Sequence, residues 1–194
     1  MAYADPPYLG QSRKRYGGAE VNHRLLIAHL CDEFPDGWAL SCSSPSLRVL
    51  LPLCPDDCRV GAWVKPFHIF KQGVRPAYAW EPLLFRGGRN AQPVPPPRGG
   101  VATTPRDWYA GNITLRRGLP GAKPDGFCFW VFDLLNLQAG DELVDLFPGT
   151  GAVGAAWHRY AERLPLTVGD SWVTAAVDPP VPDTGTPSTR GKAS

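Results

Sequence analysis

Proline and glycine interrupt this chain so often that no long helix or strand fits between them. The sequence holds 22 Pro and 21 Gly among 194 residues, and Pro neither continues a helix nor donates to the middle of a sheet. Hydrophobic residues still make up 43% of the chain, and seven residues are Trp. Such a content of apolar and aromatic side chains argues against global disorder. We therefore expect one folded core with long Pro/Gly-rich loops or tails.

Strand-like apolar runs alternate with segments of helical periodicity along the chain. A very short strand over 3–4 ends at two prolines, and Pro35 ends the first helix. The predicted helices cover 20–33, 45–53, 127–137 and 152–163, and the other predicted strands cover 38–43, 59–64, 77–85, 141–147 and 172–177. This alternation favours an α/β fold with an open, mostly parallel sheet. The domain is expected to span 1–177, and the Pro-rich residues 178–194 are expected to form a disordered tail.

Several classes of protein are disfavoured by composition. No apolar run approaches the roughly 20 residues of a membrane helix, and the first residues lack the basic and apolar regions of a signal peptide. We therefore expect a cytoplasmic protein without a membrane partner. The cysteines are expected to be free thiols, and no metal site is expected because the Cys54 and Cys58 spacing has no second pair.

A basic segment lies within a chain that is almost neutral overall. The formal net charge of the whole sequence is +2, yet residues 86–123 contain one acidic residue, Asp107, against seven basic residues: Arg86, Arg89, Arg98, Arg106, Arg116, Arg117 and Lys123. Proline and glycine exclude regular structure from most of the first half of this segment. The segment is either a solvated loop or a contact surface for a polyanion.

A glycine-rich turn follows the predicted strand 141–147. It carries Asp145, Phe147, Gly149, Thr150 and Gly151 at the junction with the next helix. Glycines at such a junction allow the backbone to approach a ligand closely, and the N–H groups of the helix point into the crevice. The turn lacks the Lys-Ser/Thr pair of a nucleotide-binding P-loop. We expect the carboxylate of Asp145 to face a cationic group instead.

A rigid turn, Asp5-Pro6-Pro7-Tyr8, follows the first strand. It holds a carboxylate, the carbonyl group of Pro6 and an aromatic ring close together. This set suits a flat heterocycle that bears an amino group, because Asp5 and the Pro6 carbonyl accept both N–H bonds while Tyr8 stacks on the ring. The alternative is an ordinary turn with a buried tyrosine.

Together the two turns resemble motifs of the S-adenosylmethionine-dependent amino-methyltransferases of nucleic acids, which make N6-methyladenine or N4-methylcytosine. Asp5-Pro6-Pro7-Tyr8 looks like the catalytic D-P-P-Y motif, and 145–151 looks like the D-x-F-x-G-x-G cofactor motif. Lys123-Pro124 looks like the K-P element that precedes the cofactor motif in permuted members, and Trp80-Glu81 is a weaker match to a W/H-E pair. The resemblance covers residues 3–163. The order of the motifs is that of the circularly permuted β-class.

The resemblance implies a Rossmann-like methyltransferase fold, circularly permuted, with helices flanking the sheet. It also implies methyl transfer from S-adenosylmethionine to the exocyclic amine of a DNA base, with adenine N6 favoured over cytosine N4. The implied catalytic residues are Asp5, Pro6, Pro7 and Tyr8. The implied cofactor-binding residues are Lys123, Pro124, Asp145, Phe147, Gly149, Thr150 and Gly151.

In the family, the region that recognises the target lies in the position of residues 86–123. We accordingly predict nucleic-acid contacts at Arg13, Lys14, Arg15, Arg89, Arg98 and Arg106. Few residues remain after the cofactor helix, and Asp170 is the sole acid among residues 164–177. We therefore expect a truncated sheet, with loose specificity or with a partner chain, as a homodimer or a specificity subunit. A catalytically inactive module that binds nucleic acid or a partner stays open, and so do methylation of cytosine N4 and of RNA.

Overall fold

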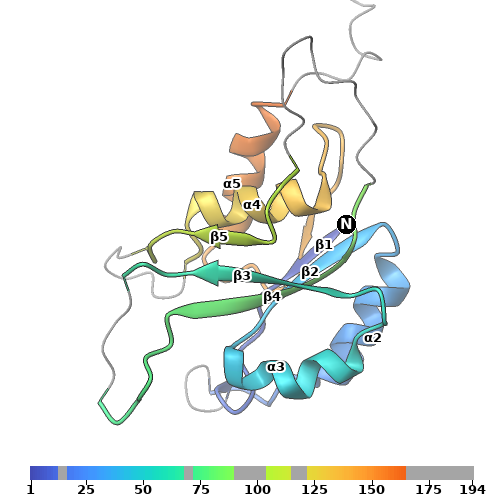
Figure 1. Ribbon diagram of the computed structural model, residues 1–194. Coiled ribbons are helices and arrows are strands. Elements are labelled where there is room, and N and C mark those ends of the chain that lie inside the picture. The colour runs from blue at the N-terminus through green and yellow to red at the C-terminus, as the bar shows by residue number, and fades with distance from the viewer. Residues whose placement is uncertain (13–16, 68–71, 90–103, 115–121, 165–194) are drawn as a thin grey trace, which may run out of the picture. The chain divides into compact units, whose positions relative to one another are not determined.

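A six-stranded mixed sheet forms the centre of the protein (Figure 1). The computed structural model describes residues 1–12, 17–67, 72–89, 104–114 and 122–164. The strand order is β5-β3-β4-β2-β1-β6. β4 is antiparallel to β2 and β3, and the other pairings are parallel. The strands are β1 (Ala2–Ala4), β2 (Gly37–Ser41), β3 (Arg59–Val64), β4 (Trp80–Gly87), β5 (Trp108–Ala110) and β6 (Val144–Asp145).

Helices cover both faces of the sheet, as Figure 1 shows. On one face lie α4 (Asp125–Leu135) and α5 (Ala152–Ala161), and on the other lie α2 (His23–Glu33) and α3 (Ser44–Leu50), which the short 3₁₀ turn Leu51–Leu53 follows. Side chains alternate between the two faces along each strand. In β1, for example, Tyr3 packs on the α4 side while Ala2 and Ala4 pack on the α2 side.

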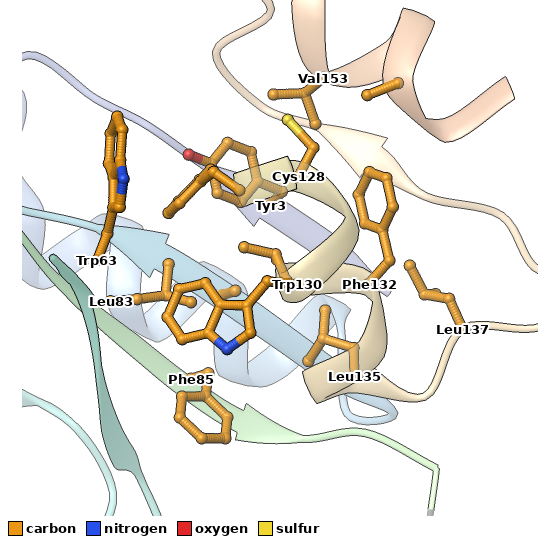
Figure 2. Close-up of a cluster of buried hydrophobic side chains, with 14 residues drawn as sticks. Tyr3, Trp63, Leu83, Phe85, Cys128, Trp130, Phe132, Leu135, Leu137 and Val153 are labelled. Carbon is orange, nitrogen blue, oxygen red and sulfur yellow. The ribbon is translucent and has the colours of Figure 1, made fainter. Parts of the chain in front are cut away.

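The core on the α4 side is rich in aromatic rings (Figure 2). Phe127 and Trp130 of α4 pack with their ring centroids 5.8 Å apart, and Phe127 also packs on Trp63 of β3 at 4.8 Å. The indole N–H of Trp130 donates to the carbonyl oxygen of Arg106 at 2.7 Å, so this buried polar group is satisfied. The apolar run that predicts this helix is thus buried against the sheet.

The other core is mainly aliphatic. Leu30 of α2, Leu50 of α3 and Leu40 of β2 are fully buried there. The side chain of Asn22 caps α2 by accepting the N–H of Leu25 at 3.2 Å. All five cysteines are free, as predicted, and four of them belong to or border this core: Cys31, Cys42, Cys54 and Cys58.

The edge of the sheet at which β2 begins is closed by three glycines. A Cβ atom on Gly37 would lie 2.5 Å from the backbone nitrogen of Gly88, and one on Gly87 would lie 2.9 Å from the Cα of Gly37. Gly87 and Gly88 also have positive φ angles of 68° and 90°. Only glycine fits this backbone crossing without displacing the chain.

The predicted α/β architecture and the mostly parallel sheet are confirmed, with differences of detail. Strand 141–147 is shorter than predicted, because only Val144–Asp145 pairs with β1. β5 was not predicted, since it lies inside the Pro/Gly-rich segment and forms by pairing with β3. The predicted strand 172–177 and the predicted tail lie outside the described residues. Within the described part of the chain, no helix combines the length and apolar character needed to span a membrane.

Candidate active site

The two predicted turns leave the sheet at the same edge. β1 and β6 are adjacent and parallel, with Tyr3 in register with Asp145. The N–H of Leu146 donates to the carbonyl oxygen of Tyr3 at 3.0 Å, which continues the pairing to the last residues of both strands. Because parallel strands end at one edge of a sheet, Asp5 and Phe147 both follow directly on this edge. The structure therefore brings together the residues of the two motifs.

The first turn is joined to a network of charged side chains. Nζ of Lys123 lies 3.1 Å from Oδ1 of Asp5 and 3.6 Å from Oε2 of Glu81. The hydroxyl group of Tyr8 donates to the same Oε2 of Glu81 at 3.0 Å. Lys65 forms an ion pair with the other oxygen, Oε1 of Glu81. Three segments distant in the sequence thus hold Asp5 and Tyr8 in place.

Lys123 occupies an unusual position, immediately before a helix. Pro124 is the N-cap of α4, and its carbonyl oxygen accepts the N–H groups of Phe127 and Cys128. The positive end of a helix dipole disfavours a nearby cation, and the side chain of Lys123 is only 7% exposed. Its ammonium group is held instead by the two carboxylates and by the faces of the Trp63 and Phe127 rings, each 5.5 Å away.

The ionisation of this network follows from burial and mutual attraction. Burial raises the pKa of Asp5, and Lys123 opposes that shift. Burial also raises the pKa of Glu81, but the two ammonium groups outweigh it, so its pKa lies below the ordinary value. For Lys123, burial lowers the pKa, yet the surrounding acidic and phenolic oxygens raise it well above the ordinary value. Burial raises the pKa of Tyr8, which keeps its hydroxyl group protonated as a donor.

The second turn leaves a polar atom without a partner. Oδ1 of Asp145 accepts the N–H of Phe147 at 3.2 Å, whereas Oδ2 is buried and no hydrogen bond reaches it from the residues that the structure describes. Burial raises the pKa of Asp145. Gly149 and Gly151 have φ angles of 47° and 73°, and a Cβ on either would have no close contact. Space therefore adjoins the turn, and Thr150 is exposed there.

The predicted nucleic-acid contacts are not brought to this edge where the structure describes them. Arg89 follows β4 at the opposite edge and binds Asp141 through two hydrogen bonds of 2.7 and 2.6 Å. Arg106 precedes β5, at the amino end of that strand, with its guanidinium 5.3 Å from the centre of the Trp108 ring. Four further predicted contacts lie outside the described residues: Arg13, Lys14, Arg15 and Arg98.

The structure adds two residues to the site that sequence reasoning did not assign to it. Glu81 was noted only through the weak Trp80-Glu81 match, yet it links Tyr8, Lys123 and Lys65. Lys65 carried no sequence signal, because it reaches the site through the antiparallel pairing of β3 and β4, which sets Val64 opposite Trp80.

Comparison with known proteins connects this arrangement to one fold. No family model and no curated protein matches the chain. Among solved structures, that of the M1.HpyAVI-SAM complex is similar with a TM-score of 0.55 and 18% identity, over 84% of this chain and 78% of that chain. A structure of M1.HpyAVI gives a TM-score of 0.52 and 14% identity, over 82% and 75% of the two chains. The chain thus has a Rossmann-like methyltransferase fold, as predicted.

Proposed function

We propose that this protein transfers a methyl group from S-adenosylmethionine to the exocyclic amine of a DNA base, with adenine N6 as the favoured target. One observation carries the proposal: Asp5 and Asp145 end neighbouring parallel strands, so that a base and a methyl donor bound to the two turns would meet. The fold similarity to the M1.HpyAVI-SAM complex supports it. The preference for adenine rests on the resemblance of residues 5–8 to D-P-P-Y.

The chemistry on the amine side needs acceptors more than a strong base. The lone pair of an exocyclic amine is delocalised into the ring, so the nitrogen is a poor nucleophile. When Asp5 and the carbonyl oxygen of Pro6 accept its two N–H bonds, the nitrogen becomes pyramidal and exposes its lone pair. Tyr8 would stack on the base and compensate part of the cost of taking it out of a duplex. The reaction then depends on positioning and electrostatics.

Lys123 serves this step through Asp5. The ion pair at 3.1 Å engages Oδ1 of Asp5, and Oδ2 is the oxygen that the amine would reach. By opposing the rise in the pKa of Asp5, the ammonium group favours the ionised carboxylate, which is the form that accepts. Glu81 fixes the hydroxyl group of Tyr8 and hence the position of the far end of the ring.

The second turn fits a cationic ligand. Oδ2 of Asp145 is a buried acceptor that lacks a partner among the described residues, and open space adjoins Gly149 and Gly151. A buried polar atom of this kind is costly unless a ligand satisfies it. Asp145, Phe147, Gly149, Thr150 and Gly151 would hold S-adenosylmethionine, with Lys123 and Pro124 bordering the pocket. When bound, the cofactor supplies an electrophilic methyl group on a sulfonium.

A transfer assay tests this function directly. The purified chain is incubated with radiolabelled S-adenosylmethionine and unmethylated DNA, and the DNA is then digested to nucleosides. Label in N6-methyl-2′-deoxyadenosine supports the proposal, and label in N4-methyl-2′-deoxycytidine corrects the base. A parallel reaction with RNA tests that substrate. If no nucleoside is labelled and calorimetry detects no cofactor binding, the proposal is wrong, and the alternative of an inactive binding module is favoured.

A further inference from the structure

The basic segment 86–123 offers little free charge where the structure describes it. Arg86 forms an ion pair with Asp57 at 2.7 Å, and Arg89 forms one with Asp141. Lys123 is buried in the candidate site, and Arg106 lies over Trp108. These cations are therefore already engaged by the protein itself. Within the described part of the chain, a contact surface for a nucleic-acid strand that reaches Asp5 must therefore be sought outside this segment, at the same edge of the sheet.

The loop between β3 and β4 leaves the sheet at that edge. It begins beside Val64 and ends at Trp80, which is paired with Val64. Lys65 and Glu81, at its two ends, belong to the network that holds Tyr8. Residues 65–80 contain no acidic residue, three basic residues and four aromatic ones. Basic residues interleaved with aromatic ones are typical of surfaces that bind single-stranded nucleic acid.

Part of this loop forms an exposed surface, here called the aromatic shelf and consisting of Arg75, Tyr78 and Trp80. The three side chains line one open hollow together with Ser44, which begins α3. Tyr78 is 53% exposed and Trp80 is 39% exposed. Within the described part of the chain, no carboxylate forms an ion pair with Arg75. The shelf thus presents two aromatic rings and a cation to solvent.

The shelf and the candidate site lie on opposite sides of β4. Trp80 and Glu81 are successive residues of a strand, so their side chains point to opposite faces of the sheet. Glu81 faces the Lys123 side, where Asp5 and Tyr8 are held. A strand that places one base against Tyr8 would therefore have to cross this edge of the sheet to reach the shelf. The shelf suits a neighbouring nucleotide and not the base that reacts.

We propose that the aromatic shelf binds an unpaired nucleotide next to the target base, with its base stacked on Tyr78 and Trp80 and its phosphate group near Arg75. This inference rests on the proposed function, since it gives the same DNA strand a second point of attachment. Stacking suits such a site because every base presents a π face, so the contact tolerates any sequence. The shelf would also retain a strand whose duplex opens around the extruded base.

Binding of a dye-labelled single-stranded oligonucleotide, followed by fluorescence anisotropy, tests the shelf. Tyr78→Ala is expected to raise the dissociation constant about tenfold, in line with the usual loss of one stacked base. Tyr78→Phe keeps the ring and is expected to bind like the wild type. Leu25→Ala removes an exposed apolar side chain of α2, 64% exposed, and is the matched control. Circular dichroism verifies that each variant is folded.

An abasic oligonucleotide separates stacking from charge. Without bases, Tyr78→Ala and the wild type should bind equally, whereas Arg75→Ala should weaken binding of both oligonucleotides and reduce the salt slope by about one. The inference is wrong if Tyr78→Ala binds the normal oligonucleotide like the wild type. It is equally wrong if the variant loses as much affinity for the abasic one.

Assays of binding and of methyl transfer on the same proteins distinguish a failure of the shelf from a failure of the proposed function. The wild type and Tyr78→Ala are also assayed for methyl transfer, with Asp5→Ala as the variant expected to lose it. If the wild type transfers no label while Tyr78→Ala still loses binding, the proposed transfer fails and the shelf stands as a binding surface. If the wild type transfers label and Tyr78→Ala binds normally, only the shelf is refuted.

Discussion

The two turns at the active edge of the sheet differ in how far the protein satisfies its own polar groups. After β1, Asp5 is paired with Lys123, and Tyr8 is hydrogen-bonded to Glu81. After β6, one oxygen of Asp145 is buried without a partner in the described structure, and the glycines beyond it adjoin open space. The first turn is therefore held rigid by side chains, whereas the second is left incomplete.

This difference suggests that the two substrates are handled in opposite ways. Groups that must stabilise a changing amine gain from being fixed before the reaction begins. A pocket for a cofactor can instead leave an acceptor unsatisfied, because the ligand supplies the missing partner when it binds. The following variants each disturb one of the two turns.

Asp5→Ala should have the largest effect. It removes the carboxylate that we propose accepts an N–H bond of the amine, so kcat should fall by at least about 10²-fold, by analogy with the loss of one oriented group in other active sites. Affinity for S-adenosylmethionine, measured by calorimetry, should stay within about twofold of the wild type, because Asp5 belongs to the first turn. Unchanged methyl transfer in this variant would refute the role given to Asp5.

Asp145→Asn should act on the second turn alone. The loss of a charged acceptor facing a cation should weaken cofactor binding by about ten- to a hundredfold, while kcat at saturating cofactor should change little. Because burial raises the pKa of Asp145, this group contributes stability that is present at low pH and lost as pH rises through its folded-state value. The variant should lack this pH dependence in thermal unfolding. A large fall in kcat with unchanged cofactor affinity would mean that the second turn acts on the reaction step and does not bind the cofactor.

Glu81→Gln should loosen the first turn without removing a substrate contact. The variant lacks the negative charge that accepts the hydroxyl group of Tyr8 and pairs with Lys65 and Lys123. We therefore expect kcat to fall about tenfold, the order expected for a hydrogen bond to a charged group. Glu33→Gln, at the exposed end of α2, is the matched control and should have wild-type rates. The reading of Glu81 as a positioning residue fails if both variants behave alike.

Lys123→Met should change the pH dependence of kcat/KM more than it lowers the maximal value of kcat/KM. Burial already raises the pKa of Asp5, and loss of the ammonium group should raise it further, because Lys123 lowers it. The acid limb of kcat/KM should therefore move to higher pH. Lys65→Met should move the limb in the same direction by less, since Lys65 lowers the pKa of Asp5 less than Lys123 does. If the acid limb lies at the same pH in the wild type, Lys123→Met and Lys65→Met, the two lysines do not influence the pKa of Asp5.

Sequence reasoning located the two motifs at one edge of the sheet, because each motif is a short local pattern. Asp5, Tyr8 and Asp145 stand in short motifs, and the structure sets their strands side by side. It failed where partners are distant: the count of basic residues could not show that Arg89 is paired with Asp141, 52 residues away. Likewise, the three residues of β5 have no strong pattern of their own and become a strand only by pairing with β3.

The glycine crossing at the far edge has a consequence for any survey of variants. Gly37, Gly87 and Gly88 lie at the opposite edge of the sheet from Asp5, yet a side chain on Gly37 or Gly87 would clash with the backbone of the paired chain segment, and one on Gly88 would clash with the backbone of Leu135 in α4. A screen that scores only methylation would rank these positions with the motif residues. Measuring the amount of folded protein in the same cells would separate the glycine positions from the motif residues. Substitutions at the crossing should lower that amount, whereas Asp5→Ala should leave it unchanged and the protein inactive.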